Sequence, residues 1–119
     1  AAIFGGETTV SVRGGGLGGR CQEIALAAAI EINGAEGIGV MAIGTDGTDG
    51  PTDAAGALVD GGTLDRARAV KLDPESMLAD NDSYSLLKVT RDLLITGPTG
   101  TNVNDIMIAF SEGVQRRVD

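Results

Sequence analysis

The sequence contains no histidine and no tryptophan, and it has one cysteine in 119 residues. Without histidine the chain lacks the commonest general base and metal ligand, so a Cys–His nucleophilic pair cannot form within it. A single cysteine excludes an internal disulfide and fits a reducing compartment, so we expect a cytoplasmic protein. Aromatic residues make up only 3% of the chain, and the core must therefore consist of isoleucine, leucine, valine and alanine.

Basic residues are also scarce, since nine Lys and Arg stand against 17 Asp and Glu, a formal net charge of −8. Nucleic acids and anionic membranes both attract basic surfaces, so we expect neither as a partner. No apolar run approaches the roughly 20 residues that a membrane-spanning helix needs, and no signal peptide is visible. The chain begins Ala-Ala-Ile-Phe without Met, and we expect it to be a fragment of a longer protein.

Glycine, in contrast, is abundant, with 19 residues. The glycines gather in three clusters, within residues 14–19, 44–50 and 97–100. They predict three loops where the backbone turns sharply or approaches a ligand. A length of 119 residues is enough for one domain with one core, so we treat residues 1–119 as a single domain.

The central stretch is residues 38–53, with the sequence IGVMAIGTDGTDGPTD. Its apolar part, Val40–Ile43, predicts a buried strand that is parallel to its neighbours and covered on both faces. Asp46, Asp49 and Asp53 follow among glycines and a proline, which forbid a regular element and place the acids on a tight loop. Open α/β sheets bind ligands at such loops, whereas Asp and Gly also form plain solvated turns. Both interpretations remain open.

The first glycine cluster lies between an expected strand, Thr8–Val12, and an expected helix, Gln22–Ile32. It contains the spacing G-x-G-x-x-G of dinucleotide-binding loops, although such a dense run of glycines also matches by chance. It fails the P-loop pattern, because Arg20-Cys21 stands where Lys-Ser/Thr is required. We interpret Cys21 as a small packing residue.

The start of the expected helix offers a second interpretation of these glycines. A glycine-rich turn at a helix N-terminus exposes backbone N–H groups and a partial positive charge. Arg20 would add a fixed cation, so a phosphate or a carboxylate could bind there. Alternatively, the glycines only let the strand and the helix pack closely. The sequence does not decide between the two.

Strands alternate with helices along the rest of the chain. Further strands are expected at residues 57–59, 93–95 and 106–110, further helices at 63–70, 74–79 and 83–89, and a frayed extension at 111–119. This order predicts an α/β fold, a three-layer α/β/α sandwich with a mostly parallel or mixed sheet of about five strands.

Two polar loops, residues 45–53 and 96–105, and the turn at 14–20 could then meet at one edge of the sheet. Together they supply carboxylates, hydroxyls, amide donors and one arginine, but no nucleophile–base pair. Such a set suits a polyoxygenated or phosphorylated small molecule, with Mg²⁺ held through one or two carboxylates.

Four segments in order carry a resemblance to a known family: GGETTVSVRGGGLGGRCQEIALAAA, AIGTDGTDGPTDAAGALVDG, LADNDSYSLL and DLLITGPTGTNVNDIMIAF. From about Gly5 to about Phe110 the chain resembles the MOFRL domain. This is the C-terminal domain of class II glycerate 2-kinases, which are also labelled hydroxypyruvate reductases of the tartrate pathway. Cys21 stands where the family often has Asn, and Gly15 and Leu17 stand where it often has basic residues.

The resemblance implies part of an ATP- and Mg²⁺-dependent kinase that converts D-glycerate to 2-phosphoglycerate. A larger Rossmann-like N-terminal domain, absent from this chain, would be its partner, with the active site in the cleft between the two domains. We therefore expect the 119 residues alone to be inactive. The enzyme could also form a homo-oligomer.

Carried over by motif, the resemblance also implies site residues. The catalytic candidates are Arg20, Asp46 and Asp49, and either acid could bind the metal. The candidates for binding substrate or nucleotide are Gly18, Gly19, Thr45, Thr48, Thr99, Gly100, Thr101, Asn102 and Asp105.

Two alternatives belong to other functional classes. The older family label implies an oxidoreductase that reduces hydroxypyruvate with a nicotinamide cofactor. Against it, hydride transfer usually needs a general acid, and this chain offers no histidine for that role. The other alternative is a non-catalytic module that binds a small molecule. A longer reading frame upstream of the first residue would favour a two-domain enzyme over such a module.

Overall fold

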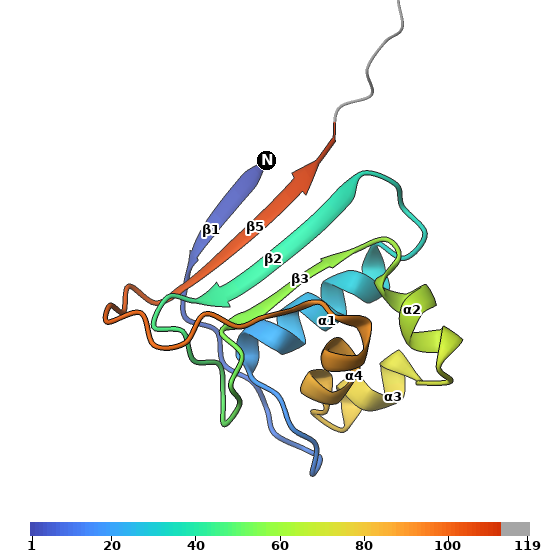
Figure 1. Cartoon of the computed structure of the whole chain (residues 1–119), viewed down its shortest axis with the longest axis horizontal. Coiled ribbons are helices and arrows are strands. Elements are labelled where there is room, and N and C mark those ends of the chain that lie inside the picture. The colour runs from blue at the N-terminus through green and yellow to red at the C-terminus, as the bar shows by residue number, and fades with distance from the viewer. Residues whose placement is uncertain (113–119) are drawn as a thin grey trace, which may run out of the picture.

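The computed structural model describes residues 1–112, which form one sheet and four helices (Figure 1). The part of the expected C-terminal extension beyond residue 112 lies outside the described residues. The strands are β1 Ala2–Gly6, β2 Ile38–Gly44, β3 Gly56–Asp60, β4 Leu93–Leu94 and β5 Asp105–Ser111. The helices are α1 Arg20–Glu31, α2 Thr63–Ala69, α3 Pro74–Ala79 and α4 Ser83–Thr90.

The sheet has the strand order β1-β5-β2-β3-β4, and all of its neighbouring strands are antiparallel. The expected three-layer sandwich with a mostly parallel or mixed sheet is therefore wrong. The chain returns from β2 to β3 through residues 45–55, which contain no helix. A parallel neighbour would need a crossover of about a dozen residues or more, usually with a helix.

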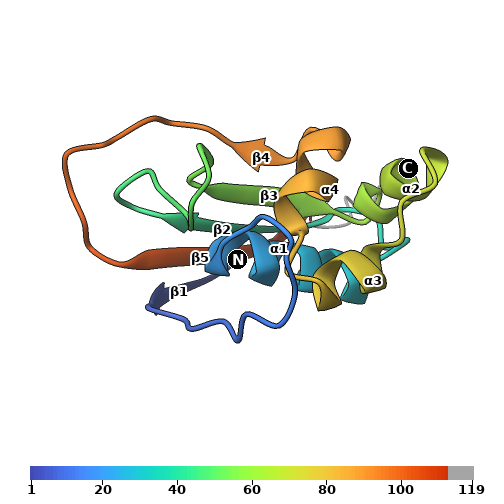
Figure 2. The same cartoon turned by 90° about the horizontal axis from the view of Figure 1, so that it is seen from below.

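The helices lie on one side of the sheet and cover part of it when the molecule is seen from below (Figure 2). Val40 and Ala42 of β2 stand opposite Val59 and Ala57 of β3, so these four side chains share the face that meets the helices. The core contains the following buried side chains: Ala25, Leu26, Ala29, Ala57, Val59, Leu64, Ala67, Leu86 and Leu87. As expected, small and branched aliphatic residues build it.

The opposite face of the sheet is also apolar, but no helix covers it within residues 1–112. Met41 of β2 stands opposite Leu58 of β3 and Ile108 of β5, and Ile108 in turn stands opposite Ile3 of β1. Leu58 is 38% exposed and Ile3 is 71% exposed. The expectation of a central strand covered on both faces therefore fails within this chain.

The strand expected at Thr8–Val12 is also wrong, because the first strand is β1, at Ala2–Gly6. β1 pairs with β5 and is an edge strand of the sheet, and the next segment leaves the sheet instead of adding a further strand beside it. Residues 7–19 instead cross irregularly to the helices, where the carbonyl of Ser11 accepts a hydrogen bond from Asn81. The alternation of β-branched residues was thus not enough to define a strand.

The remaining elements lie within two residues of their expected bounds. Asp73 caps α3, since its carboxylate accepts the amide of Ser76, and Pro74 begins the helix as predicted. Among the described residues, no helix is long and apolar enough to cross a membrane.

Candidate functional site

The three glycine-rich segments meet at one end of the sheet, as the sequence predicted. This is the end where β2 stops and where β3 and β5 begin (left of Figure 1). The hydroxyl of Thr45 donates to the carbonyl of Asn104 at 2.7 Å and accepts the amide of Val103 at 2.8 Å. The hydroxyl of Thr99 donates to the carbonyl of Thr45. These bonds tie the two polar loops together.

Arg20, the first residue of α1, is fixed by Asp105, the first residue of β5. Its Nε donates to one carboxylate oxygen at 2.5 Å and its Nη2 donates to the other at 2.8 Å. Asp105 is 1% exposed, whereas the side chain of Arg20 is 29% exposed. This fork-to-fork geometry holds the guanidinium plane, while its Nη1 has no partner among residues 1–112 and can still donate to an anion.

The same pairing keeps Arg20 charged. Its hydrogen bonds to Asp105 raise the pKa of Arg20 above its ordinary range, against the opposing effect of burial. The cation is therefore permanent at any pH at which the protein is folded. A permanent, oriented and half-buried guanidinium is the arrangement that binds carboxylates and phosphates well.

Asp49, one of the predicted catalytic acids, lies in the protein interior with no exposed surface. One carboxylate oxygen accepts the amide of Cys21 at 3.0 Å, and the other accepts the amide and the side-chain Nε2 of Gln22, each at 2.9 Å. Asp49 thus caps the N-terminus of α1 from a loop 27 and 28 residues away. This geometry gives Asp49 a positioning role and leaves it no surface on which to touch a substrate.

Cys21 follows Arg20 and is fully buried. Burial, and then the negative charges of Asp49 and Asp105, raise the pKa of the Cys21 thiol well above its ordinary value. The thiol is therefore protonated at neutral pH and is a poor nucleophile. This environment agrees with the interpretation of Cys21 as a packing residue.

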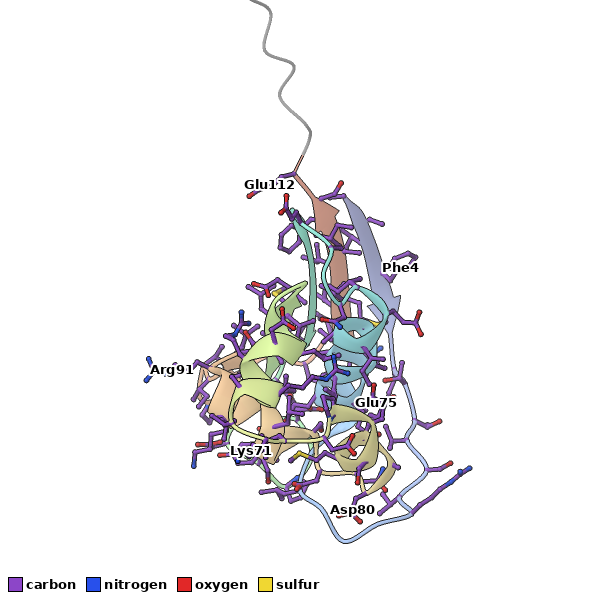
Figure 3. The ribbon with its side chains drawn as sticks, turned by 90° about the vertical axis from the view of Figure 1, so that its right-hand side faces the viewer. Phe4, Lys71, Glu75, Asp80, Arg91 and Glu112 are labelled. Carbon is purple, nitrogen blue, oxygen red and sulfur yellow. The ribbon has the colours of Figure 1, made fainter. Side chains whose placement is uncertain are left out.

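For most of the first glycine cluster, the structure distinguishes between the two interpretations, an anion-binding turn and close packing. The five consecutive amides from Arg13 to Leu17 donate to oxygens of Asp80, Asn81 and Asp82 in the α3–α4 turn. Figure 3 labels Asp80 beside this pale-blue loop. These amides are satisfied within the protein, so they do not form an open cradle for a phosphate.

The glycines of this cluster also allow close packing. A Cβ at Gly14 would collide with Asp80, and a Cβ at Gly16 would collide with Asp82. The amides of Gly18, Gly19 and Arg20, in contrast, have no hydrogen-bond partner among residues 1–112. The first part of the cluster therefore serves packing, and only its last part remains available to an anion.

Gly18, Gly19 and Arg20 border a hollow of about 260 Å³. Gly50 and Asn81 form part of its wall. The hollow lies at the N-terminus of α1, where the helix dipole favours negative charge. The wall also contains the acidic residue Glu23 and the apolar residues Val10, Val12 and Pro51, so only the part beside Arg20 suits the carboxylate or phosphate group of a small molecule.

The second polar loop contains the other predicted binding residues, Thr99, Gly100, Thr101 and Asn102, and all of them are exposed. The Oδ1 of Asn102 accepts the amide of Asn104 at 3.0 Å, so this side chain also shapes its own loop. Among residues 1–112, the hydroxyl of Thr101 has no partner. It can therefore bind a ligand.

Asp46 and Thr48 lie in the acid loop, where Asp46 accepts the amide of Thr48 at 3.0 Å through Oδ1. Its second carboxylate oxygen has no partner among the described residues. Residues 1–112 hold no group of three metal-ligating side chains. Of the two acids considered for a metal, Asp46 is the one with an oxygen available.

Sequence reasoning missed the part that the turn Asp80-Asn81-Asp82 plays at this site, because these residues only separate two expected helices, 74–79 and 83–89. A usable signal was present, since three polar residues that can accept hydrogen bonds stand together in one of the four motif segments. That signal could not reveal which backbone amides, far away in the sequence, donate hydrogen bonds to these three residues.

This fold and site can be compared with known proteins. The sequence profile of the MOFRL family matches residues 1–105, and the chain therefore belongs to the MOFRL family. D-glycerate 2-kinase of Thermotoga maritima is 60% identical over 110 residues, which cover 92% of this chain and 26% of that protein. Glycerate 2-kinase of Pyrococcus horikoshii is 55% identical over 109 residues, which cover 91% of this chain and 24% of that protein.

Another relative, from Agrobacterium vitis, is provisionally named a hydroxypyruvate reductase and is 50% identical over 106 residues, or 87% of this chain and 24% of that protein. The crystal structure of glycerate kinase from Thermotoga maritima superimposes with a TM-score of 0.91 at 58% identity, over 92% of this chain and 27% of that one. This chain therefore spans about a quarter of the length of its relatives.

Proposed function

We propose that this domain supplies the anion-binding side of the active site of a glycerate 2-kinase. In the proposed reaction, the 2-hydroxyl oxygen of D-glycerate attacks the γ-phosphorus of ATP. The bond from this phosphorus to the β–γ bridging oxygen breaks, ADP leaves, and the hydroxyl proton is released. The products are 2-phosphoglycerate and ADP. The rest of the polypeptide, which the relatives contain and this chain lacks, would provide the opposite wall of the cleft.

The observation that carries this proposal is the fixed guanidinium of Arg20 beside three free backbone amides. Phosphoryl transfer needs mainly positioning and charge neutralisation, and Arg20 supplies both because Asp105 holds its plane. Arg20 would bind either the carboxylate of glycerate or the transferring phosphoryl group. The kinase names of the most similar relatives support the same reaction.

ATP is the phosphate donor that kinase relatives imply, and Mg²⁺ would accompany its phosphates. Mg²⁺ usually keeps several waters and uses one or two protein carboxylates beside the substrate phosphates. We propose Asp46 as the ligand from this domain, because Asp49 is buried and its oxygens are occupied. The metal would neutralise phosphate charge, and Arg20 would act independently of it.

The reductase alternative rests on the name of the Agrobacterium vitis relative and on the G-x-G-x-x-G spacing. In a dinucleotide-binding loop the glycine-rich backbone approaches the pyrophosphate between a parallel strand and a helix. Here the amides of residues 13–17 are used by the α3–α4 turn, and the sheet is antiparallel. These observations favour the kinase.

The proposal is tested on the full-length parent protein with D-glycerate, ATP and Mg²⁺, by measuring 2-phosphoglycerate. NADH oxidation with hydroxypyruvate runs beside it. We expect phosphoryl transfer, which Arg20→Ala reduces by a factor of about 100 to 1,000, the usual cost of losing one charge-stabilising donor. The 119-residue chain alone should be inactive in both assays. NADH consumption without phosphoryl transfer would favour the reductase, and no activity in either assay would favour the binding module.

A further inference from the structure

The α3–α4 turn, Asp80-Asn81-Asp82, has a shape that suits an asparagine at its centre. Asn81 lies in the left-handed region, with φ of 57°, which asparagine tolerates better than most residues. The backbone amides of Asn81 and Asp82 donate to the carbonyls of Leu78 and Met77 of α3, at 3.1 and 2.8 Å. The turn is therefore held by its own helix, independently of the glycine-rich loop.

This turn presents a row of acceptors to that loop. Asn81 Oδ1 accepts the amides of Arg13 and Gly14 at 2.6 and 2.9 Å. Asp80 accepts the next two amides, through its carboxylate at 3.3 Å and its carbonyl at 3.0 Å, and Asp82 accepts the amide of Leu17 at 3.1 Å. Three consecutive residues of the turn thus fix the position of the backbone at five consecutive residues of the loop.

Asn81 also reaches past the loop to α1. Its Nδ2 donates to the carbonyl of Ser11 at 3.2 Å and to the carboxylate of Glu23 at 2.6 Å. Glu23 lies in the same first turn of α1 as Arg20. One side chain therefore joins the segment before the loop, the loop itself and the helix that begins at Arg20. Only an amide can accept and donate in this way.

We propose that Asn81 is a positioning residue that sets the place of Gly18, Gly19 and Arg20 at the anion site. Asn81 borders the same hollow as these three residues. The α3–α4 side also fixes the last residue before them, because the amide of Tyr84 donates to the carbonyl of Leu17 at 2.9 Å. The expected effect of Asn81 on KM rests on the proposed function. Its effect on the order of the glycine-rich loop does not.

The test uses two substitutions in the full-length parent protein. Asn81→Asp keeps the acceptor for the amides of Arg13 and Gly14 but places a carboxylate against Glu23. Adding Glu23→Gln restores a donor opposite that carboxylate, so the double variant should recover in part. Asn33→Asp is the matched control, because it makes the same charge change at an exposed asparagine just beyond the other end of α1.

Two readouts are measured on the same samples. The first is amide hydrogen exchange of residues 13–17. It should become about tenfold faster in Asn81→Asp, because repulsion from Glu23 displaces the new carboxylate from the amides of Arg13 and Gly14 and costs roughly one hydrogen bond's free energy. The second is the KM for D-glycerate and for ATP. One of the two should rise about tenfold or more, since a misplacement of about 1 Å can cost about 100-fold. Arg20→Ala should raise the same KM.

We expect Glu23→Gln to reverse both changes in part and Asn33→Asp to cause neither. The inference is overturned if Asn81→Asp leaves exchange at 13–17 unchanged. It is also overturned if kcat falls while both KM values stay the same, which would mean a loss of folded protein rather than a misplaced site. If the wild-type protein forms no 2-phosphoglycerate, the proposed function fails, and the exchange data alone then decide whether Asn81 orders the loop.

Discussion

Two arginines in this domain pair with aspartates at opposite ends of the sheet. Arg20 meets Asp105 with Nε and Nη2, so each nitrogen binds a different oxygen. Arg66 of α2 meets Asp92 with a single nitrogen, at 2.9 and 3.1 Å, and reaches Asp60 with the other at 3.3 Å. Asp105 is 1% exposed and Asp92 is 10% exposed, whereas Asp60 is 58% exposed.

The difference teaches what an ion pair needs in order to serve a binding site. Both terminal nitrogens of Arg66 already contact carboxylates, so the pair links α2 to the ends of β3 and β4. Arg20 is held from one side only, and its Nη1 faces no acceptor among residues 1–112. One carboxylate that binds Nε and Nη2 orients the cation and leaves Nη1 available, whereas carboxylates on both terminal nitrogens only neutralise it.

The largest difference between the two pairs should appear when the guanidinium fork is removed but its charge is kept. In the full-length parent protein we expect Arg20→Lys to lower kcat/KM by about 100-fold, because lysine cannot keep two bonds to Asp105 and still present a planar donor to an anion. Arg66→Lys should change it by less than about twofold. Steady-state kinetics with D-glycerate and ATP measure both. Equal losses in the two variants would remove the distinction between the pairs.

A smaller contrast is expected in stability. Asp105→Ala leaves the half-buried Arg20 without its buried partner, which should cost about 2–3 kcal/mol. Asp92→Ala at the other pair should cost less, about 1 kcal/mol, because Arg66 is 43% exposed and keeps its contact with Asp60. Urea unfolding of the full-length protein, followed at a signal specific to this domain, gives both values. The comparison fails if Asp92→Ala is the more damaging change.

The smallest effect concerns Cys21, which shares the negative surroundings of Arg20. Because its pKa is raised in the folded protein, its contribution to stability is complete below the pKa of the unfolded thiol, about 8.5. Above that pH the unfolded state gains a thiolate that the folded state does not form, so stability falls. Cys21→Ala should therefore lose less stability than wild type between about pH 7.5 and about pH 9.5.

The control for this prediction is chemical. Iodoacetamide at about pH 8 should modify Cys21 far more slowly in the folded protein than in urea, because the thiolate is the reactive form. Rapid alkylation of the native protein would mean that Cys21 is neither buried nor protonated. It would also contradict the charge environment assigned to Arg20.

The sequence was sufficient to predict most helices and strands and the meeting of the three loops, because capping residues, glycines and apolar runs act locally. It could not predict the direction of the strands. A short apolar run such as Val40–Ile43 suits a buried parallel strand and the covered half of an antiparallel one equally well. The direction depends instead on the route of residues 45–55, which local propensities do not determine.

The same limit applies within the site. The resemblance made Arg20 and Asp49 both catalytic candidates, and the whole glycine run was considered as an anion cradle, whereas Asp49 lies buried with its oxygens occupied and the amides of residues 13–17 bond within the protein. Both assignments depend on which partner takes each polar group, and the partners are distant: Asp49 caps a helix 27 and 28 residues earlier, and Asn81 accepts amides 67 and 68 residues earlier. Residue type predicts the capacity to bond, whereas the fold selects the partner.

The position of β5 has a consequence for the order in which the domain is built. Among the described residues β5 is the last strand to be synthesised, yet it lies between β1 and β2. Until it is synthesised, β1 has no neighbour and Arg20 has no Asp105. β5 must therefore be synthesised before the central ladder can close, and these long-range pairings place the domain among slow-folding topologies. During translation the apolar edges of β1 and β2 remain open to other chains, which makes this the stage at which a molecular chaperone has most to protect.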